Sequence, residues 1–267
     1  MKKALLYVFL FIAIQVGLAF CADVVLKMFW PDHSLESPKT MLWFTAATSA
    51  ITGILFAITK WTPISRDYIR SRPWVTMIWT ILLAIGIVLP LSWAEELLPA
   101  AWRTSEEIEM MTKMLKLPEG YFILCMLVPL VEEMVFRGAV ITELKKWLAA
   151  KPNSQLSTLN FQLIIISALF FAAVHMNLAQ MPHAFVMGCL LGWLYVRTGS
   201  IVPGLLVHWI NNTASYVFIM MFPQIPADAE LSAYFGGSQM AVAQAVIASL
   251  LIAIPSFYQV YLRTKNK

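Results

Sequence analysis

The stretch VTMIWTILLAIGIVLPLSW, residues 75–93, runs for 19 positions without a charged side chain. An α-helix rises 1.5 Å per residue, so about 20 mostly apolar residues cross a hydrocarbon core of ~30 Å. The apolar residues are continuous rather than alternating with polar ones, which favours a helix over a strand of a membrane barrel. This stretch therefore predicts a transmembrane helix.

Seven further stretches share this apolar character, and 60% of the 267 residues are hydrophobic while 13% are charged. The mean hydropathy of +0.72 lies outside the range of soluble domains. The eight stretches are Leu5–Leu26, Met41–Thr59, Val75–Trp93, Tyr121–Leu144, Leu159–His175, Ala184–Arg197, Ile201–Met221 and Met240–Leu262. We therefore expect an all-α, polytopic membrane helix bundle with about eight transmembrane helices, forming a single integral membrane domain over residues 1–267.

Lysine and arginine are unevenly divided between the loops that join these stretches, and cytoplasmic loops are normally the ones enriched in both. With the N-terminus inside, thirteen basic residues fall on the cytoplasmic side and five on the outer side. The inner set is Lys2, Lys3, Lys60, Arg66, Arg70, Arg72, Lys145, Lys146, Lys151, Arg197, Arg263, Lys265 and Lys267, and the outer set is Lys27, Lys39, Arg103, Lys113 and Lys116. Both termini are therefore expected in the cytoplasm of a multi-pass protein of the bacterial inner (plasma) membrane.

The net charge of +4 is explained by this topology. No loop combines a basic patch with interleaved aromatic residues, so the expected partner is the lipid bilayer and not a nucleic acid.

The first stretch follows Lys2 and Lys3 as a cleavable signal does, but its long apolar run favours an uncleaved helix. The three cysteines lie in apolar stretches and are interpreted as small core residues.

Two adjacent acids interrupt the fourth stretch, in the sequence PLVEEMVFRG at residues 129–138. Glu133 and Arg137 are four residues apart with the acid first, the favourable order for an ion pair on a helix. Glu132 points about 100° away and is free to face a cavity, where a partly neutralised carboxylate suits a general base. Ionisable groups at membrane depth are costly and mark functional sites by default. The alternative is an acidic cluster that only holds helices together.

Two further pairs with helical spacing lie in apolar stretches, Phe171 with His175 and His208 with Asn212. Each pair places its two side chains on one face of a helix. We interpret Asn211 as a packing or helix-contact residue because it faces another side. No other apolar stretch carries a comparable polar pattern.

The ordered motifs Glu-Glu-x-x-x-Arg, Phe-x-x-x-His and His-x-x-x-Asn on successive apolar stretches resemble those of the CAAX protease and bacteriocin-processing family (CPBP, or Abi), whose members include type II CAAX prenyl endopeptidases. The stretch GCLLGWLYVRTGSI, residues 188–201, is also similar to the family's approach to its last motif. The resemblance covers about residues 121–215, the expected catalytic core, and every motif position matches.

The resemblance implies an intramembrane endopeptidase that hydrolyses a membrane-associated protein or peptide with a glutamate-activated water. Glu132 and His175 would activate the water, while His208 and Asn212 would donate hydrogen bonds to the oxyanion. The Glu133–Arg137 ion pair would support the site and Phe171 would pack within it. The resemblance favours a metal-independent reaction without cofactors. A metal site is the alternative and would draw on Glu132, His175 and His208.

Other functions stay open at this stage. A member of such a family can act as a membrane scaffold or in bacteriocin self-immunity without cleavage, and buried acids can also form the proton relay of a transporter. A transporter is disfavoured because the chain shows no paired halves.

The substrate can be a prenylated protein, a leader peptide or another membrane protein, and the resemblance favours entry from the cytoplasm. The motifs lie at different predicted depths, so helices must tilt, break or start elsewhere. Pro129, Pro182 and Pro203 are plausible places for re-entrant or unwound segments.

Overall fold

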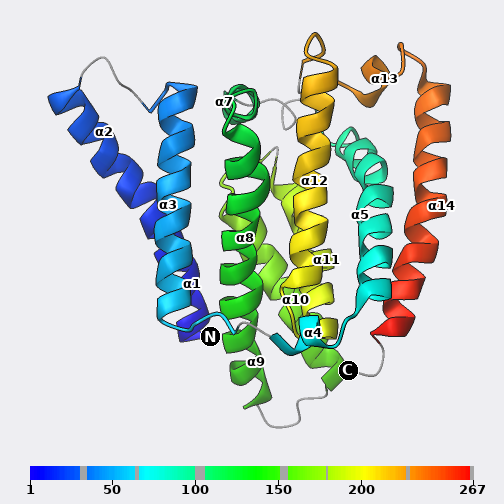
Figure 1. Cartoon of the computed structure of the whole chain (residues 1–267), viewed down its shortest axis with the longest axis horizontal. Coiled ribbons are helices and arrows are strands. Elements are labelled where there is room, and N and C mark those ends of the chain that lie inside the picture. The colour runs from blue at the N-terminus through cyan, green and yellow to red at the C-terminus, as the bar shows by residue number, and fades with distance from the viewer. Residues whose placement is uncertain are drawn as a thin grey trace.

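The structure is a computed structural model that describes residues 1–30, 35–63, 66–99, 106–150, 156–178, 180–226 and 229–264. The described residues form helices and no strand, which confirms the all-α prediction. Eight long helical segments run side by side, and short helices lie at their ends (Figure 1). The long segments are Lys2–Phe29 (α1 Lys2–Ile12, η1 Ala13–Gly17 and α2 Leu18–Phe29), α3 (Pro38–Ile58), α5 (Trp74–Glu95), residues 121–149 (η2 Tyr121–Leu127, α8 Val128–Glu133, η3 Met134–Ile141 and α9 Thr142–Ala149), α10 (Leu156–Ala173), α11 (Met181–Thr198), α12 (Val202–Met221) and α14 (Gln239–Arg263). The short helices are α4 (Arg66–Arg70), α7 (Glu106–Leu115) and α13 (Leu231–Tyr234).

The eight long segments coincide with the eight predicted stretches, but several boundaries differ by three or more residues. Two of the differences bear on the site. The α10 helix ends at Ala173, so His175 lies just beyond it rather than on its last turn. Met176 then adopts a left-handed φ of 49°, which a helix cannot continue. The α11 helix begins at Met181, three residues earlier than predicted, because Pro182 is tolerated in a first turn where the N–H groups are unpaired anyway.

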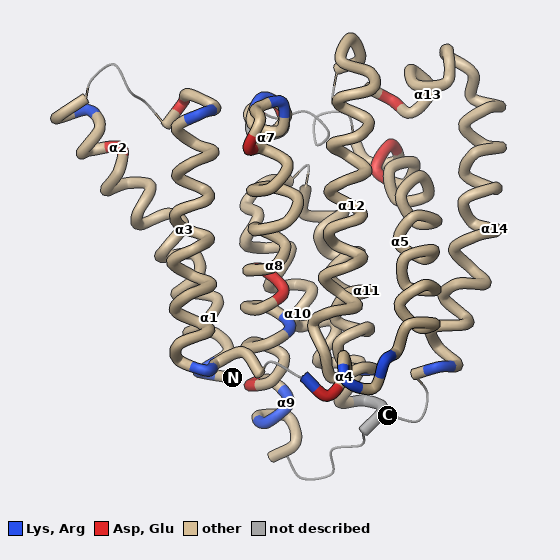
Figure 2. Tube along the Cα trace, in the orientation of Figure 1, with Lys and Arg blue, Asp and Glu red and all other residues tan. Residues whose placement is uncertain are grey.

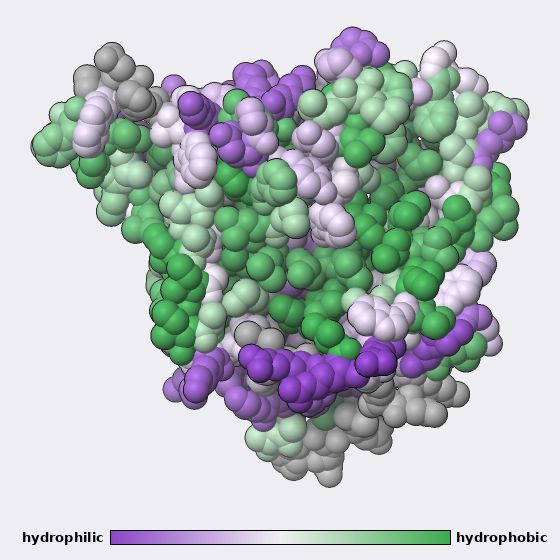
Figure 3. All heavy atoms as spheres, viewed as in Figure 1, coloured by the Kyte–Doolittle hydropathy of each residue, from purple (hydrophilic) through white to green (hydrophobic). Residues whose placement is uncertain are grey.

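The bundle has the surface of an integral, multi-pass membrane protein. Figure 3 shows a hydrophobic middle between hydrophilic ends. Among the described helices, four are long and apolar enough to cross a membrane, namely Lys2–Phe29, Pro38–Ile58, Trp74–Glu95 and Gln239–Arg263, and Leu159–Ala173 is a shorter apolar helix. The segments that carry the polar motifs are not among the four, so their crossing stays a prediction.

The charges divide between the two ends of the bundle. Figure 2 shows Lys and Arg concentrated at the end formed by the start of α1, by α4 and α9, and by the end of α14, which we call the basic end. Acidic side chains are prominent at the opposite end, with α7 and α13. The predicted basic positions Arg103, Lys151, Lys265 and Lys267, as well as His33, lie outside the described residues. The observed division agrees with the predicted topology, in which the basic end faces the cytoplasm.

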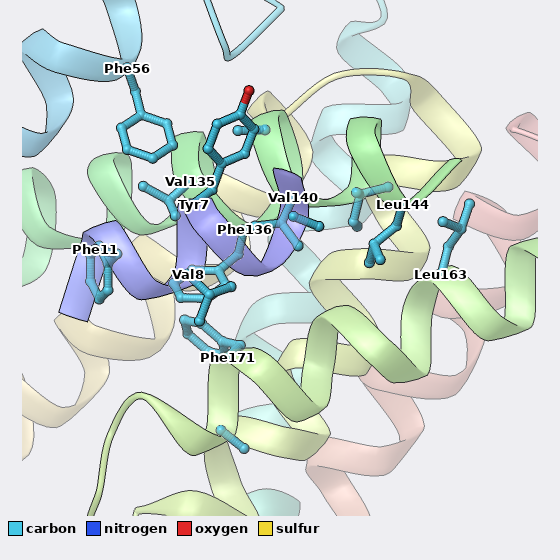
Figure 4. Packing of buried hydrophobic residues seen from close by; sticks show 14 of the residues in the cluster. Tyr7, Val8, Phe11, Phe56, Val135, Phe136, Val140, Leu144, Leu163 and Phe171 are labelled. Atoms are coloured by element: carbon cyan, nitrogen blue, oxygen red, sulfur yellow. The ribbon is translucent and has the colours of Figure 1, made fainter. Parts of the chain in front are cut away.

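The largest apolar core surrounds the half of the 121–149 segment nearer the basic end. Tyr7, Val8 and Phe11 of α1 pack there against Phe136 (Figure 4), which also contacts the Phe171 ring of α10 at 5.3 Å between centroids. This packing fixes the direction of the segment that bears both glutamates.

The 121–149 segment is π-helical on both sides of α8. A π-helical turn shifts the backbone pairing and is frequent at functional sites. Two carbonyls of η3 find partners on other segments: the Thr62 hydroxyl donates to Met134 O at 2.6 Å, and the Ser167 hydroxyl donates to Phe136 O at 3.3 Å. These bonds tie the segment to its neighbours next to the glutamates.

Candidate active site

The two adjacent glutamates of α8 have different surroundings. Glu133 is fully buried, and its Oε1 lies 2.9 Å from Nη1 of Arg137, which is also fully buried. The Arg137 guanidinium lies 4.3 Å from the centre of the Phe171 ring, a cation–π contact. Glu132 keeps 14% of its side chain exposed and borders a cavity. The ion pair and the different direction of Glu132 are those that the sequence predicts.

His208 of α12 lies between the two glutamates, an arrangement that sequence analysis did not predict. Its Nε2 is 3.5 Å from Glu132 Oε2, and its Nδ1 is 3.3 Å from Glu133 Oε1. A neutral imidazole donates through only one nitrogen, whereas an imidazolium donates through both. His208 therefore contacts both carboxylates, so Glu132 has a partner that the sequence did not indicate, and Glu133 has one in addition to Arg137.

His175 is oriented by the end of α10. Its Nδ1 lies 2.7 Å from the carbonyl of Phe171, to which it donates, so that Nε2 carries the lone pair. Phe171 is 2% exposed, and its ring contacts the rings of His175 and His208 with centroid distances of 5.0 and 5.8 Å. Phe171 therefore packs between the two histidines, which accounts for its presence in the motif.

Asn212 is held from two sides. Its Nδ2 donates to the Leu124 carbonyl at 3.1 Å, and its Oδ1 lies 3.4 Å from Asn211 Nδ2. Asn211 Nδ2 is also 3.3 Å from Nε2 of His183, whose Nδ1 is paired with the Glu95 carboxylate. A polar chain thus leads from Glu95 through His183 and Asn211 to Asn212.

Asn211 makes a helix contact, one of the two predicted alternatives, because it reaches His183 of α11, but the expectation that it faces another side than Asn212 was wrong. Neighbouring helix positions differ by about 100° in direction, but a wide cavity accommodates both Asn211 and Asn212. Glu95 and His183 were missed because they lie 88 positions apart at helix ends, where no local spacing connects them.

A cavity of about 480 Å³ brings the predicted residues together. Glu132, His175, His208 and Asn212 all line it, together with Glu95, His183 and Asn211. A second cavity of about 200 Å³, lined by Gln15, Thr45 and Ser49 among others, also reaches Glu132 and His175. These two residues therefore line both cavities.

The mismatch in depth is resolved without broken helices. Pro129 lies in the first turn of α8, yet the helix continues across it with π-helical pairing on both sides. No unwound segment occurs at Pro129, and Pro182 and Pro203 lie in the first turns of α11 and α12, where helical pairing does not require their N–H groups. The α11 helix instead starts elsewhere than predicted, which was one of the expected alternatives.

Across the described ranges, no three His, Cys, Asp or Glu side chains are arranged to bind a metal ion. Glu132 and Glu133 each contact His208.

Comparison with known proteins shows a similarity to one family over the part of the chain that carries the motifs. The fold and site define a membrane helix bundle with a buried glutamate–arginine pair beside a polar cavity. Residues 116–214, which include all three motifs, match the family model described as Type II CAAX prenyl endopeptidase Rce1-like. Over this stretch the chain is similar to the CAAX proteases.

One relative is "Membrane-embedded CAAX protease MroQ" of Staphylococcus aureus (strain USA300), which is 28% identical over 120 residues. The match covers 45% of this chain and 47% of MroQ, so it spans about half of each protein. No solved structure matches the chain.

Proposed function

We propose that this protein is an intramembrane endopeptidase that hydrolyses a membrane-associated protein or peptide in the inner membrane of a bacterium. The observation that carries this proposal is the gathering of Glu132, His175, His208 and Asn212 around one cavity inside a membrane bundle. The match of residues 116–214 to the Rce1-like family model and the name of the relative support the same activity.

In the proposed reaction, Glu132 is the general base. Water placed between Glu132 and His175 attacks the scissile carbonyl while its proton passes to the Glu132 carboxylate. His175 has its Nδ1 bound to the Phe171 carbonyl, so Nε2 is available to accept a hydrogen bond from the same water. When the C–N bond breaks, the proton held by Glu132 passes to the departing amine. Water supplies the nucleophile, so no serine or cysteine is required.

Asn212 and His208 stabilise the negative charge that develops on the carbonyl oxygen. One N–H of the Asn212 amide is bound to Leu124, which leaves the second for the oxyanion. Rotating this amide by 180° would turn its Oδ1 toward the Leu124 carbonyl, where two acceptors repel each other. Asn211, by donating to Asn212 Oδ1, stabilises the productive orientation. An oxyanion donor of this kind contributes ~10²-fold or more to the rate.

Buried Glu133 and Arg137 support this chemistry without touching the substrate. Their ion pair fixes the α8 backbone, and Glu133 also contacts the ring of His208. We propose that the reaction needs no metal ion, because acid, base and hydrogen-bond donors are all supplied by side chains.

The test is a comparison of the membrane proteome and released peptides from cells that produce the wild-type protein or Glu132→Gln. We expect cleavage products that appear only with the wild type. Glu109→Gln is the matched control, because Glu109 lies on α7, is exposed and pairs with Lys113 in its own helix. Identical products from wild type and Glu132→Gln would refute the proposed function.

A further inference from the structure

Access to Glu132 differs between the two ends of the bundle. Toward the basic end, the segment after Glu132 is packed into the main apolar core, and its side chains are at most 2% exposed at Glu133, Val135, Phe136, Arg137, Ala139, Val140, Ile141, Leu144 and Leu148. At 1.5 Å per residue, the distance from Glu132 to Leu148 corresponds to roughly 24 Å of packed helix. Figure 4 shows this core filled by side chains of α1, α3 and α10. A peptide cannot reach Glu132 through it.

Toward the opposite end, the large cavity leads away from Glu132. Its lining includes Thr112 of α7, Leu231 of α13 and Glu95 at the end of α5. The exposed fraction of the side chain rises from 14% at Glu132 to 37% at Glu95. Residues of α4 and α9, the short elements of the basic end, do not contribute to the lining. The cavity therefore opens at the end that bears α7 and α13.

The charge distribution indicates which side of the membrane this end faces. Lys and Arg gather at the basic end (Figure 2), and membrane proteins place that end in the cytoplasm. The smaller cavity does not change this assignment, because Gln15, Thr45 and Ser49 lie within the spans of the first two long segments rather than at the basic end. The mouth of the large cavity thus faces the extracytoplasmic side, contrary to the entry from the cytoplasm that the sequence resemblance favoured.

The cavity lining also bears on the charge of the substrate. Glu95, Glu96 and Glu132 line the cavity, and no Lys or Arg is among its described lining residues. Glu95 is paired with His183, and Glu96 accepts a hydrogen bond from the Leu231 N–H, so both carboxylates are held in place. Fixed carboxylates in a partly desolvated cavity repel a peptide's terminal carboxylate and attract a cationic side chain.

We propose that the substrate is an extracytoplasmic segment of a membrane or secreted peptide, which enters from the end that bears α7 and α13 and carries a basic residue near the cleaved bond. A cytoplasmic tail that ends in a free carboxylate at the cleavage site does not fit this cavity. This inference rests on the proposed function in that it assumes a cleaved substrate, whereas the side of entry follows from the cavity and the charge distribution.

The side of entry is tested by cysteine accessibility, which needs no activity. The three native cysteines, Cys21, Cys125 and Cys189, are first replaced by alanine. Ser215→Cys and Ser92→Cys then place single thiols in the lining of the large cavity. A membrane-impermeant maleimide is applied to intact spheroplasts and to inverted membrane vesicles, and labelling is measured by the mass shift of the protein.

Two exposed positions serve as matched controls: Lys113→Cys on α7 and Ser71→Cys beside α4 at the basic end. We expect Ser215→Cys, Ser92→Cys and Lys113→Cys to react at least ten-fold faster in spheroplasts, and Ser71→Cys to react at least ten-fold faster in inverted vesicles. The proposal is overturned if the cavity thiols react faster in inverted vesicles, if they react only after the membrane is dissolved, or if the two controls exchange sides.

The substrate class is tested by the position of the cleaved bonds. Products that depend on Glu132 should map to extracytoplasmic segments with a Lys or Arg near the cleaved bond, and cleavage in cytoplasmic tails contradicts the proposal. If no product depends on Glu132 while the cavity thiols are labelled from outside, the proposed function fails and the assigned side of the cavity stands.

Discussion

The buried Glu133–Arg137 pair provides a test that separates two adjacent acids with different roles. Both side chains are fully buried and 2.9 Å apart, so Arg137→Met leaves the Glu133 carboxylate uncompensated and Glu133→Gln does the same to the guanidinium. Removing one partner of a buried ion pair costs about 3–5 kcal/mol in soluble proteins. For a chain of this size, that corresponds to a fall in melting temperature of roughly 6–20 °C.

Glu132→Gln should behave differently. Glu132 is partly exposed to the cavity, and its contact with His208 is long, at 3.5 Å. Replacing its carboxylate by an amide of equal volume should change the free energy of unfolding by no more than about 1 kcal/mol. Activity should vanish, because the amide cannot accept a proton from water.

The assay measures the melting temperature and cleavage of the wild type and of all three variants in one detergent. Glu133→Gln and Arg137→Met should lose both stability and activity, whereas Glu132→Gln should lose activity alone. The reasoning is refuted if Glu132→Gln is the strongly destabilised variant while Glu133→Gln melts like the wild type but is inactive. In that case Glu133 is the base.

Three further predictions concern the surroundings of the site. Asn211→Asp, which cannot donate to Asn212 Oδ1, should lower kcat at least ten-fold with little change in KM. In an Asn212→Ala background the same substitution should cause no further loss of kcat. An additive loss of kcat in the double variant would mean that Asn211 does not act through Asn212. A methyl group at Gly204 would lie 2.8 Å from Glu133 Oε2, so Gly204→Ala should lower the free energy of unfolding, measured by thermal melting, by about 1–3 kcal/mol. At the control position Gly192 the nearest atom would be 3.5 Å away, so Gly192→Ala should be tolerated. Cleavage should persist after exhaustive treatment with strong zinc chelators, and loss of activity that one added metal restores would make the acids and histidines ligands instead.

The helices could be predicted from sequence because membrane spans are set by local hydropathy. Their ends could not be placed as well, since α10 stops at Ala173 and α11 starts at Met181, and these limits depend on turn geometry. The chain does not unwind at Pro129, for a related reason. A proline in the first turn of a helix costs little, and π-helical pairing accommodates Pro129 within a continuous segment.

The motif residues of the site could be found from sequence because helical spacing reveals pairs such as Glu133 and Arg137. Contacts between segments carry no such signal. His208 contacts Glu133, which lies 75 positions away in the sequence. His183 contacts Glu95, which lies 88 positions away. These contacts became visible only when the helices were packed around one cavity.

Cleavage by the purified protein reconstituted in liposomes tests the central claim, that Glu132 activates water for peptide hydrolysis, most directly. The substrate is a quenched fluorescent peptide that spans a bond mapped in the proteome comparison, and kcat is measured for the wild type, Glu132→Gln and the control Glu109→Gln. A general base contributes typically 10²–10⁴-fold, so Glu132→Gln should lose at least about 10²-fold in kcat while Glu109→Gln keeps the wild-type rate. A Glu132→Gln protein that cleaves within a few-fold of the wild-type rate would contradict the account.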